Sequence, residues 1–171
     1  MTVQVRRVEG RDERVLHQLA EVLADCVEGG ASVSFMAPLP AARALDFWRG
    51  VMDEATGGMR ILLVAEDDAG VCGTVQVLLD MPENQPHRGD VLKMLVHRRA
   101  RRRGVGEALM RSAEDAARAA GKTLLVLDTA SADAERLYER LGWQAVGVIP
   151  DYALLPQGGF CRTRFYYKRV G

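Results

Sequence analysis

The spacing of apolar residues divides the chain into segments with helical period and segments with strand period. The longer stretches repeat apolar positions every three or four residues, and glycines or prolines stand at several of their ends. The shorter runs are rich in Val, Ile and Leu and predict strands. The predicted helices span residues 12–27, 41–56, 104–120 and 133–141. The predicted strands span residues 3–8, 61–66, 71–79, 90–96, 123–127, 143–149 and 161–168.

The order of these elements predicts an α/β protein with a mixed sheet of six to seven strands and about four flanking helices. Residues 67–70, DDAG, favour a hairpin turn, whereas residues 31–36 and 81–88 are predicted loops. The helix 104–120 is expected to connect two parallel strands, with ligand at their carboxyl ends. The nearly all-apolar run 123–127 predicts a strand covered on both faces. A length of 171 residues predicts one domain over residues 1–171.

Composition and charge restrict the class of function. The formal net charge is zero, whereas proteins that bind a phosphate backbone usually have a basic excess, so no nucleic-acid partner is expected. Three scattered cysteines and three histidines without ligand spacing favour neither disulfides nor a metal site, and indicate a reducing, cytoplasmic setting. No run approaches the ~18 apolar residues of a membrane helix, and the N-terminus has no apolar stretch of signal-peptide length.

The segment from Val91 to Gly106, VLKMLVHRRARRRGVG, carries the clearest chemical signal. It predicts a strand, a basic turn and a helix N-terminus, where free backbone N–H groups and the positive end of the helix dipole would meet a phosphate or pyrophosphate. Gly104 and Gly106 would let the backbone approach the anion. Neither a dinucleotide fingerprint nor a P-loop is present. The alternative interpretation is a solvated basic loop, in which one or two arginines at most touch a ligand.

The R-x-x-G-x-G pattern that begins at Arg101 resembles the acetyl-CoA pyrophosphate loop of the GNAT acetyltransferase superfamily. The segment 134–143, AERLYERLGW, is similar to the superfamily's A-x-x-L-Y-x-x-x-G-[FW] helix and turn, and the element order resembles this fold throughout. Many members carry Asn seven residues before that Tyr, where this chain has Ser131. The resemblance implies an N-acetyltransferase that moves an acetyl group from acetyl-CoA to a primary amine by direct attack in a ternary complex, without a metal.

Within the superfamily, the chain is most similar in appearance to the tabtoxin-resistance acetyltransferases. The similar segments are the loop between the first two helices, the central strands and the C-terminal segment. They comprise residues 28–36, 90–96, 127–129, 149–153 and 163–168. This resemblance implies a small-molecule acceptor, such as an amino-acid-like compound, an antibiotic or a toxin, without identifying it. A monomer and a homodimer both remain open.

The resemblance and the residue chemistry together give candidate site residues. Tyr138 is the expected acid for the CoA thiolate, because a phenol is protonated at neutral pH and can donate as charge grows on sulfur. Asp90 and Asp128 match carboxylates of the acceptor pocket in the tabtoxin-resistance group, and would hold the ammonium group and accept its proton, directly or through water. The plainer interpretations are a packed Tyr, a strand-start charge at Asp90 and a helix cap or turn residue at Asp128. The residues expected to bind acetyl-CoA are Met94, Leu95, Val96, Arg101, Arg102, Arg103, Gly104, Val105, Gly106, Ser131 and Tyr138.

Phe35, Met36 and Tyr152 are candidate walls of the acceptor pocket, together with both carboxylates, and could equally be core or loop anchors. His97 is interpreted as a surface residue at a strand end, and the free cysteines as small buried hydrophobes. Two other functions stay open. A non-catalytic acetyl-CoA sensor would keep its function when Tyr138 is replaced by Phe. Nucleic-acid binding through residues 97–103 would show a strongly salt-dependent Kd.

Overall fold

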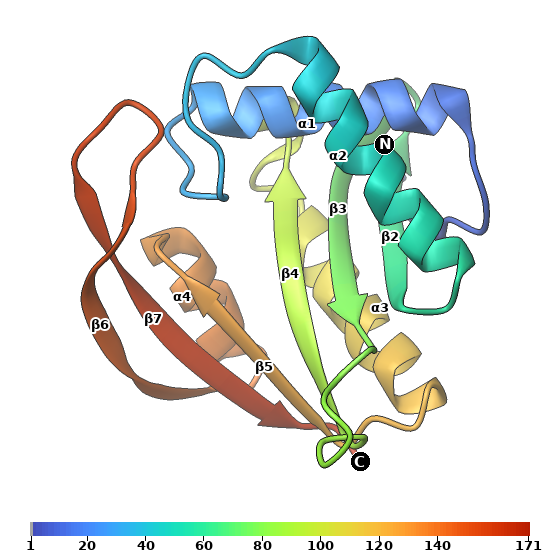
Figure 1. Cartoon of the computed structure of the whole chain (residues 1–171), viewed down its shortest axis with the longest axis vertical. Coiled ribbons are helices and arrows are strands. Elements are labelled where there is room, and N and C mark those ends of the chain that lie inside the picture. The colour runs from blue at the N-terminus through green and yellow to red at the C-terminus, as the bar shows by residue number, and fades with distance from the viewer. Residues whose placement is uncertain (1) are drawn as a thin grey trace.

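A computed structural model, in which residues 2–171 are described, shows one mixed sheet of seven strands in the order β1-β2-β3-β4-β5-β7-β6 (Figure 1). The strands are β1 (Gln4–Arg7), β2 (Arg60–Asp67), β3 (Gly70–Leu78), β4 (Arg88–Val96), β5 (Leu124–Thr129), β6 (Gln144–Leu154) and β7 (Phe160–Arg169). The helices are α1 (Glu13–Glu28), α2 (Ala41–Thr56), α3 (Val105–Ala119) and α4 (Ala132–Arg140), with a short 3-10 helix η1 (Arg98–Ala100) before α3. The predicted element order and mixed α/β architecture are confirmed.

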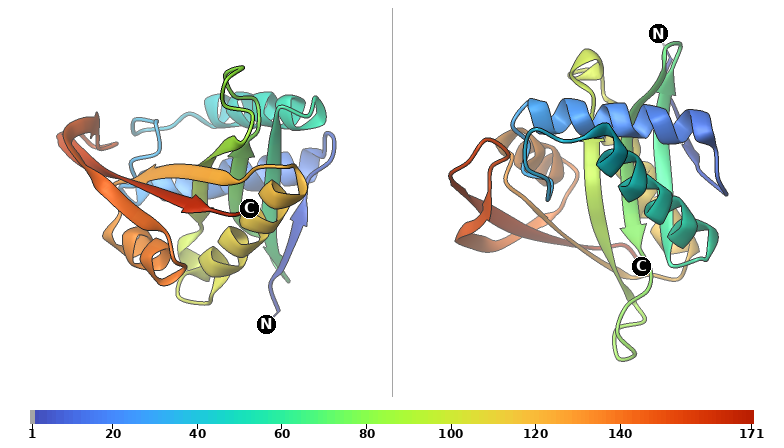
Figure 2. Two further views of the ribbon diagram at one scale, coloured as in Figure 1. Left: turned by 90° about the horizontal axis from the view of Figure 1, so that it is seen from below. Right: turned by 45° about the horizontal axis from the view of Figure 1, so that its top comes forward.

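Both faces of the sheet are covered where β2 and β3 lie. Successive strand residues point to opposite faces, so Leu62 of β2 packs with Trp48 of α2 in one core cluster, while Leu63 packs with Leu109 of α3 in the other. Helices α3 and α4 lie on the same side of the sheet, opposite α2 (Figure 2, left). Burial on both faces explains the nearly unbroken apolar runs of β2 and β3.

The prediction that residues 123–127 form a strand covered on both faces is wrong. In β5, Leu125 and Leu127 are buried, whereas Leu124 and Val126 are only partly buried. The reason is the position of the helices, because α1 and α2 lie over β2, β3 and β4 and leave that face of β5 open (Figure 1).

Strands β4 and β5 are parallel, as predicted, but they pair only between residues 88–90 and residues 124–126. Beyond this short contact the two strands diverge (Figure 1). On its other side, β4 stays paired with β3 through a bulge, where Lys93 and Met94 together stand opposite Val75. A bulge bends the strand that carries the extra residue. The carboxyl half of β4 therefore follows β3 and opens a wedge toward β5.

The hairpin of β6 and β7 completes the far side of the wedge. β7 pairs antiparallel with all of β5, and β6 pairs with β7 as the edge strand. β6 extends to Leu154, past the predicted end at Ile149, because its pairing with β7 resumes at Ala153 after a second irregularity. Asp151, inside that irregularity, has a left-handed backbone with φ of 53°.

Within residues 2–171, no helix combines the length and the apolarity needed to cross a membrane.

Replacing Leu109 by Ala tests how firmly α3 is anchored on the sheet. Leu109 is 0% exposed, so its truncation should lower the free energy of unfolding by about 2–5 kcal/mol through lost burial and a residual cavity. Val146→Ala is the control, because Val146 is 67% exposed on the edge strand and should change stability by no more than about 0.5 kcal/mol. Urea unfolding measures both. Equal effects of the two substitutions would contradict this packing.

Candidate functional site

A cavity of about 760 Å³ occupies the wedge between β4 and β5. Its walls are the carboxyl half of β4, the end of β5, the loop after α1, the turn before α3, and α4. The parallel crossover predicted a ligand site in this position, at the carboxyl ends of the two strands. The site therefore arises because β4 and β5 separate.

The N-terminus of α3 forms one wall. Gly104 precedes the helix with a left-handed backbone, φ of 76°, and the helix has no side-chain cap. No acceptor for the backbone N–H groups of Val105, Gly106 or Glu107 is found among residues 2–171. A Cβ on Gly106 would lie 3.0 Å from Leu137 Cδ2 of α4, so only glycine fits without displacing that side chain. Unpaired N–H groups at a helix N-terminus suit an anion.

The arginines of the turn point to different places. Arg101 and Arg102 line the cavity, and Arg101 Nε donates a hydrogen bond to the Val96 carbonyl oxygen at 3.3 Å. Arg103 is not among the lining residues. Its Nη1 lies 3.8 Å from Oδ2 of Asp67, a carboxylate with a 0% exposed side chain that also accepts a 2.5 Å hydrogen bond from Arg99. The expected contact of the Arg103 side chain with the ligand is thus not supported, because Asp67 draws that side chain to the other side of the turn.

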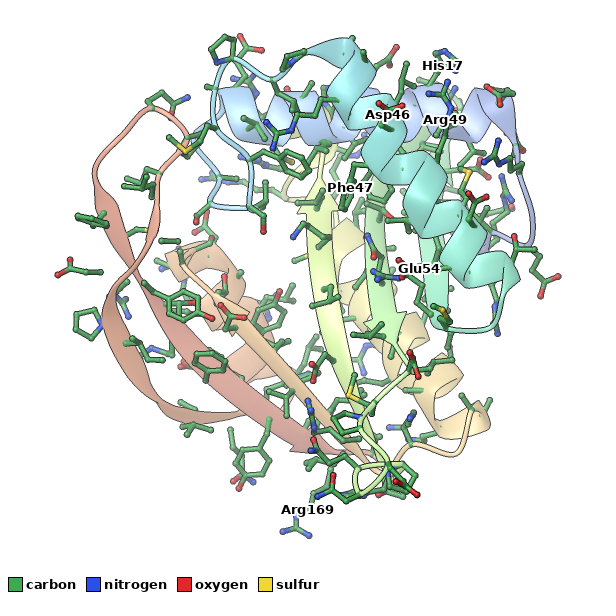
Figure 3. All side chains as sticks on the ribbon, viewed as in Figure 1. His17, Asp46, Phe47, Arg49, Glu54 and Arg169 are labelled. Atoms are coloured by element: carbon green, nitrogen blue, oxygen red, sulfur yellow. The ribbon has the colours of Figure 1, made fainter. Side chains whose placement is uncertain are left out.

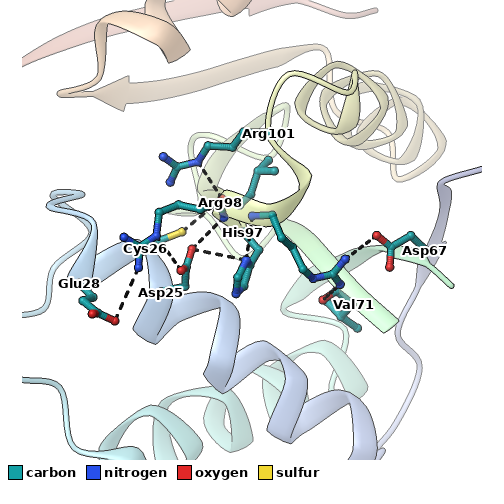
Figure 4. A network of polar contacts seen from close by, with 10 residues as sticks. Asp25, Cys26, Glu28, Asp67, Val71, His97, Arg98 and Arg101 are labelled. Carbon is teal, nitrogen blue, oxygen red and sulfur yellow. Dashed lines mark hydrogen bonds and ion pairs between the residues drawn. The ribbon is translucent and has the colours of Figure 1, made fainter. Parts of the chain in front are cut away.

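A polar network ties α1 to the start of this turn (Figure 4). Asp25 accepts hydrogen bonds from the Arg98 backbone N–H at 2.9 Å and from Arg98 Nε at 2.8 Å, and His97 Nδ1 lies 3.7 Å from the same carboxylate. Burial alone would raise the pKa of Asp25, but the Arg98 hydrogen bonds and the charges of His97 and Arg98 outweigh it, so the pKa lies below its usual value. The network positions the turn from outside the cavity.

Most of the other residues predicted for cofactor binding lie at the cavity. Met94, Leu95 and Val96 line it along the edge of β4 that β5 has left, as do Ser131 and Tyr138 on the opposite side. Ser131 caps α4, and its Oγ accepts a hydrogen bond from the Ala134 backbone N–H at 3.2 Å. The capping hydrogen bond alone explains a serine at this position, without any contact to a ligand.

Tyr138 is buried, with 4% of its surface exposed, and its ring packs edge-on against Tyr166 at 5.9 Å between centroids. Burial, and secondarily the negative charge of Asp128 and the neighbouring Tyr166, raise the pKa of its hydroxyl far above the usual value. No hydrogen bond of this hydroxyl with another group of residues 2–171 is found. The hydroxyl is therefore protonated at neutral pH and free to donate to a molecule in the cavity.

The two candidate carboxylates are in different places. Asp128 lines the cavity near the end of β5, and its Oδ2 accepts a 2.7 Å hydrogen bond from Thr163 Oγ1 of the neighbouring β7. Asp90 is not among the lining residues, because it lies where β4 and β5 are still paired, and it forms an ion pair with Arg88. The expected role of Asp90 at the acceptor ammonium therefore has no support from its position in this structure, whereas Asp128 stands at the cavity.

A second cavity, of about 320 Å³, adjoins the first, and Asp128 lines both. Phe35, Met36 and Tyr152, the predicted acceptor-pocket walls, all line this second cavity. The Phe35 ring is held edge-on by Phe47 of α2, with 5.1 Å between centroids. Cys161 also lines this cavity and is only partly buried, which departs from the prediction that the free cysteines are buried hydrophobes.

Sequence reasoning missed three polar residues of the site: Ser34, Lys93 and Thr163. Thr163 holds Asp128, and Lys93 Nζ donates a hydrogen bond to Ser34 Oγ at 3.0 Å inside the larger cavity. Lys93 had a readable signal, because it is a single charge within the apolar run from residue 91 to residue 96. Ser34 and Thr163 had none, because their role depends on which segments meet in space.

The chain belongs to the GNAT acetyltransferase family and is an acyltransferase. The model of the acetyltransferase (GNAT) domain matches residues 59–145. An uncharacterised N-acetyltransferase from the hisH-hisA intergenic region of Azospirillum brasilense is 30% identical over 129 residues, which cover 74% of each chain.

Solved structures agree on the fold. An N-acetyltransferase from Staphylococcus aureus Mu50 has a TM-score of 0.83 at 14% identity, with 100% of both chains covered. A GNAT superfamily phosphinothricin acetyltransferase from Sinorhizobium meliloti, in complex with AcCoA, has a TM-score of 0.83 at 19% identity, with 100% of this chain and 90% of that chain covered. The predicted GNAT-like fold is confirmed.

Removing the charge of Asp25 should loosen the turn. Asp25→Asn should lower the free energy of unfolding at pH 7 by about 1–2 kcal/mol, because the hydrogen bonds from Arg98 lose their charged acceptor and Arg98 is half exposed. Because the folded-state pKa is lowered, the stabilisation is complete above the unfolded value of about 3.9 and disappears as the pH falls through the folded value. Wild type and variant should therefore converge in acid.

Glu28→Gln is the matched control. Glu28 faces the same Arg98 at 3.6 Å but is 80% exposed, so its neutralisation should change stability by no more than about 0.5 kcal/mol. Denaturant unfolding of the three proteins between pH 7 and pH 3 tests the assignment. A difference between wild type and Asp25→Asn that persists unchanged in acid would exclude the carboxylate charge as its cause.

Proposed function

We propose that this protein transfers an acetyl group from acetyl-CoA to the primary amine of a small molecule, by direct attack in a ternary complex. The observation that carries the proposal is the cavity between β4 and β5. It brings together the uncapped N-terminus of α3, the free hydroxyl of Tyr138 and the carboxylate of Asp128.

The residues present fit acetyl-CoA. The N–H groups at the start of α3 and the side chains of Arg101 and Arg102 would hold the pyrophosphate, with Gly106 leaving room for close approach. The edge of β4 from Met94 to Val96 would offer backbone groups to the pantetheine arm. When bound, acetyl-CoA supplies an acetyl thioester, an activated acyl group. The acetyl-CoA complex of the Sinorhizobium meliloti structure supports this reading.

Asp128 is the proposed binding group for the acceptor ammonium and the base that takes its proton, directly or through water. Its place at the junction of the two cavities supports this role, and Thr163 orients it. A contribution of Asp90 would require a chain of water molecules, because its side chain is engaged by Arg88. The neutral amine would then attack the acetyl carbon.

Tyr138 is the proposed proton donor to the sulfur that leaves. Its high pKa keeps the proton in place until negative charge develops on sulfur. As the amide forms, the nitrogen would lose a second proton, which restores the hydroxyl of Tyr138, while the proton taken by Asp128 would pass to solvent. The products are the free thiol and the acetylated amine, with one proton released for each ammonium consumed.

The acceptor is proposed to bind in the smaller cavity, between Phe35, Met36 and Tyr152. The resemblance to the tabtoxin-resistance acetyltransferases, and the phosphinothricin acetyltransferase among the structural neighbours, support an amino-acid-like, antibiotic or toxin acceptor. A single domain over residues 1–171, a cytoplasmic location and a monomeric or homodimeric state complete the proposal.

The cofactor site is tested by placing a negative charge on the turn. Gly104→Asp should weaken acetyl-CoA binding by about tenfold to 100-fold, because a carboxylate would face the phosphates. Gly121→Asp is the control. Gly121 also has a left-handed backbone, with φ of 85°, and open space around its Cα, but it does not line the cavity. Both variants carry the same backbone cost. Calorimetric titration that finds equal losses, or no binding by the wild type, would refute the cofactor site.

The catalytic role is tested at Tyr138. Tyr138→Phe keeps the buried ring and removes the hydroxyl, so kcat should fall by about 100-fold or more with little change in the KM for acetyl-CoA. In the wild type, no loss of activity from tyrosine ionisation should occur up to about pH 10. Tyr167→Phe, which removes a hydroxyl bonded to Gln144 outside both cavities, should leave kcat unchanged. Thiol release measures the rates. An unaltered kcat in Tyr138→Phe would refute the role of Tyr138 as proton donor, whereas acetyl-CoA binding without thiol release by the wild type would favour the sensor function.

A further inference from the structure

Two residues with rare backbone conformations meet inside the larger cavity. Lys93, in the bulge of β4, has φ of 53°, and Ser34, in the loop after α1, has φ of 77°. Neither is a glycine, and such conformations are costly and concentrate at functional sites. Their side chains are in contact, because Lys93 Nζ donates a hydrogen bond to Ser34 Oγ at 3.0 Å. The bulge turns the Lys93 side chain into the cavity rather than leaving it in the regular alternation of the strand.

The Lys93 ammonium has no carboxylate within ion-pair distance among residues 2–171. Arg60, the basic group whose charge acts on Lys93, is already paired with Glu54. An ammonium has three N–H donors, of which Ser34 takes one. Lys93 is partly buried, and this burial lowers its pKa, opposed by the charge of Asp128. A partly buried cation with free donors is a binding group for an anion.

Asp128 lies on the other strand of the wedge and lines the same cavity as Lys93. Ser34 and Asp128 also line the smaller cavity, so the partner of Lys93 and the carboxylate both stand at the junction of the two cavities. The carboxylate and the ammonium are too far apart to form an ion pair with each other. A molecule that carries both an ammonium and an anionic group would match both charges, whereas a simple alkylamine or a polyamine would leave Lys93 without a partner.

We propose that Lys93, held by Ser34, binds an anionic oxygen group of the acceptor while Asp128 holds its ammonium group. The acceptor is then an amino acid or a related zwitterion. This inference rests on the proposed function and narrows its substrate class. Lys93 is a binding residue that determines specificity, and it takes no part in the proton transfers.

The test compares L-amino acids with their own amides, which keep the amine and side chain but lack the anionic group. The wild type should acetylate the acids with a kcat/KM at least about tenfold higher than that of the amides, because only the acids form the charge-assisted contact with Lys93. In Lys93→Met, the acids should lose about tenfold to 100-fold in kcat/KM and the amides much less, so that the ratio falls toward one. Lys93→Arg, which retains the charge, should restore part of the preference.

Arg169→Met is the control for loss of a positive charge, because Arg169 is exposed at the opposite end of the molecule (Figure 3). Arg169→Met should change neither the kcat/KM for the acids nor the kcat/KM for the amides. Acetyl-CoA affinity and thermal unfolding of each variant separate a damaged cofactor site or fold from a lost acceptor contact. The ratio of kcat/KM for acids to kcat/KM for amides in the wild type is a separate measure, because it requires no variant.

Each outcome decides between the two proposals. If the wild type acetylates amides as well as acids, or if Lys93→Met lowers both equally while binding acetyl-CoA normally, the role of Lys93 is refuted and the acetyltransferase function stands. If the wild type binds acetyl-CoA but acetylates neither acids, amides nor simple amines, the proposed function is refuted, and the zwitterion proposal with it. If the ratio of kcat/KM for acids to that for amides falls toward one in Lys93→Met and not in Arg169→Met, both the acetyltransferase function and the role of Lys93 are supported.

Discussion

β4 and β5 run side by side for three residues each and then part, although both continue. Backbone groups on the edge of a strand must find other partners when the neighbouring strand leaves. At β4 one of these groups, the carbonyl oxygen of Val96, is reached by the side chains of Arg101 and Cys26. Every wall of the cavity then belongs to an element that begins or ends at this opening. The separation of two paired strands is thus the constraint on which the rest of the site depends.

The opening is held from both sides. On one side, β4 is paired with β3 from Asp90 to Val96 except at the bulge, and the core beneath α1 and α2 fixes that half. On the other side, β5 is paired with β7 over its whole length, so it cannot close onto β4 without leaving β7. β4 forms its backbone hydrogen bonds with β3, and β5 forms its own with β7. The wedge is therefore a property of the fold and does not require a bound molecule.

The sequence predicted the features that depend on local order. Apolar period and turn residues located the helices and strands, and the spacing from Arg101 to Gly106 identified the turn before α3. What it could not predict depends on the length of strand contact. Asp90 begins one predicted strand and Asp128 follows the other, but the sequence does not show how far the two strands stay paired. Pairing ends just after Asp90, which leaves it engaged with Arg88 while Asp128 reaches the cavity. Arg103 was likewise drawn away by Asp67, a residue distant in sequence. Lys93 is marked in the sequence as a single charge in an apolar run, but the bulge that brings it into the site has no sequence pattern.

The close approach of Gly106 to Leu137 has a consequence for how the two ends of the site are related. A Cβ at Gly106 would stand 3.0 Å from Cδ2 of Leu137 in α4, and Tyr138 is the next residue along that helix. The turn proposed to hold the donor's phosphates and the helix that carries the proposed proton donor therefore leave no room for a further carbon atom between them at this point. A methyl group added at Gly106 would have to displace the Leu137 side chain, which is the direct neighbour of Tyr138.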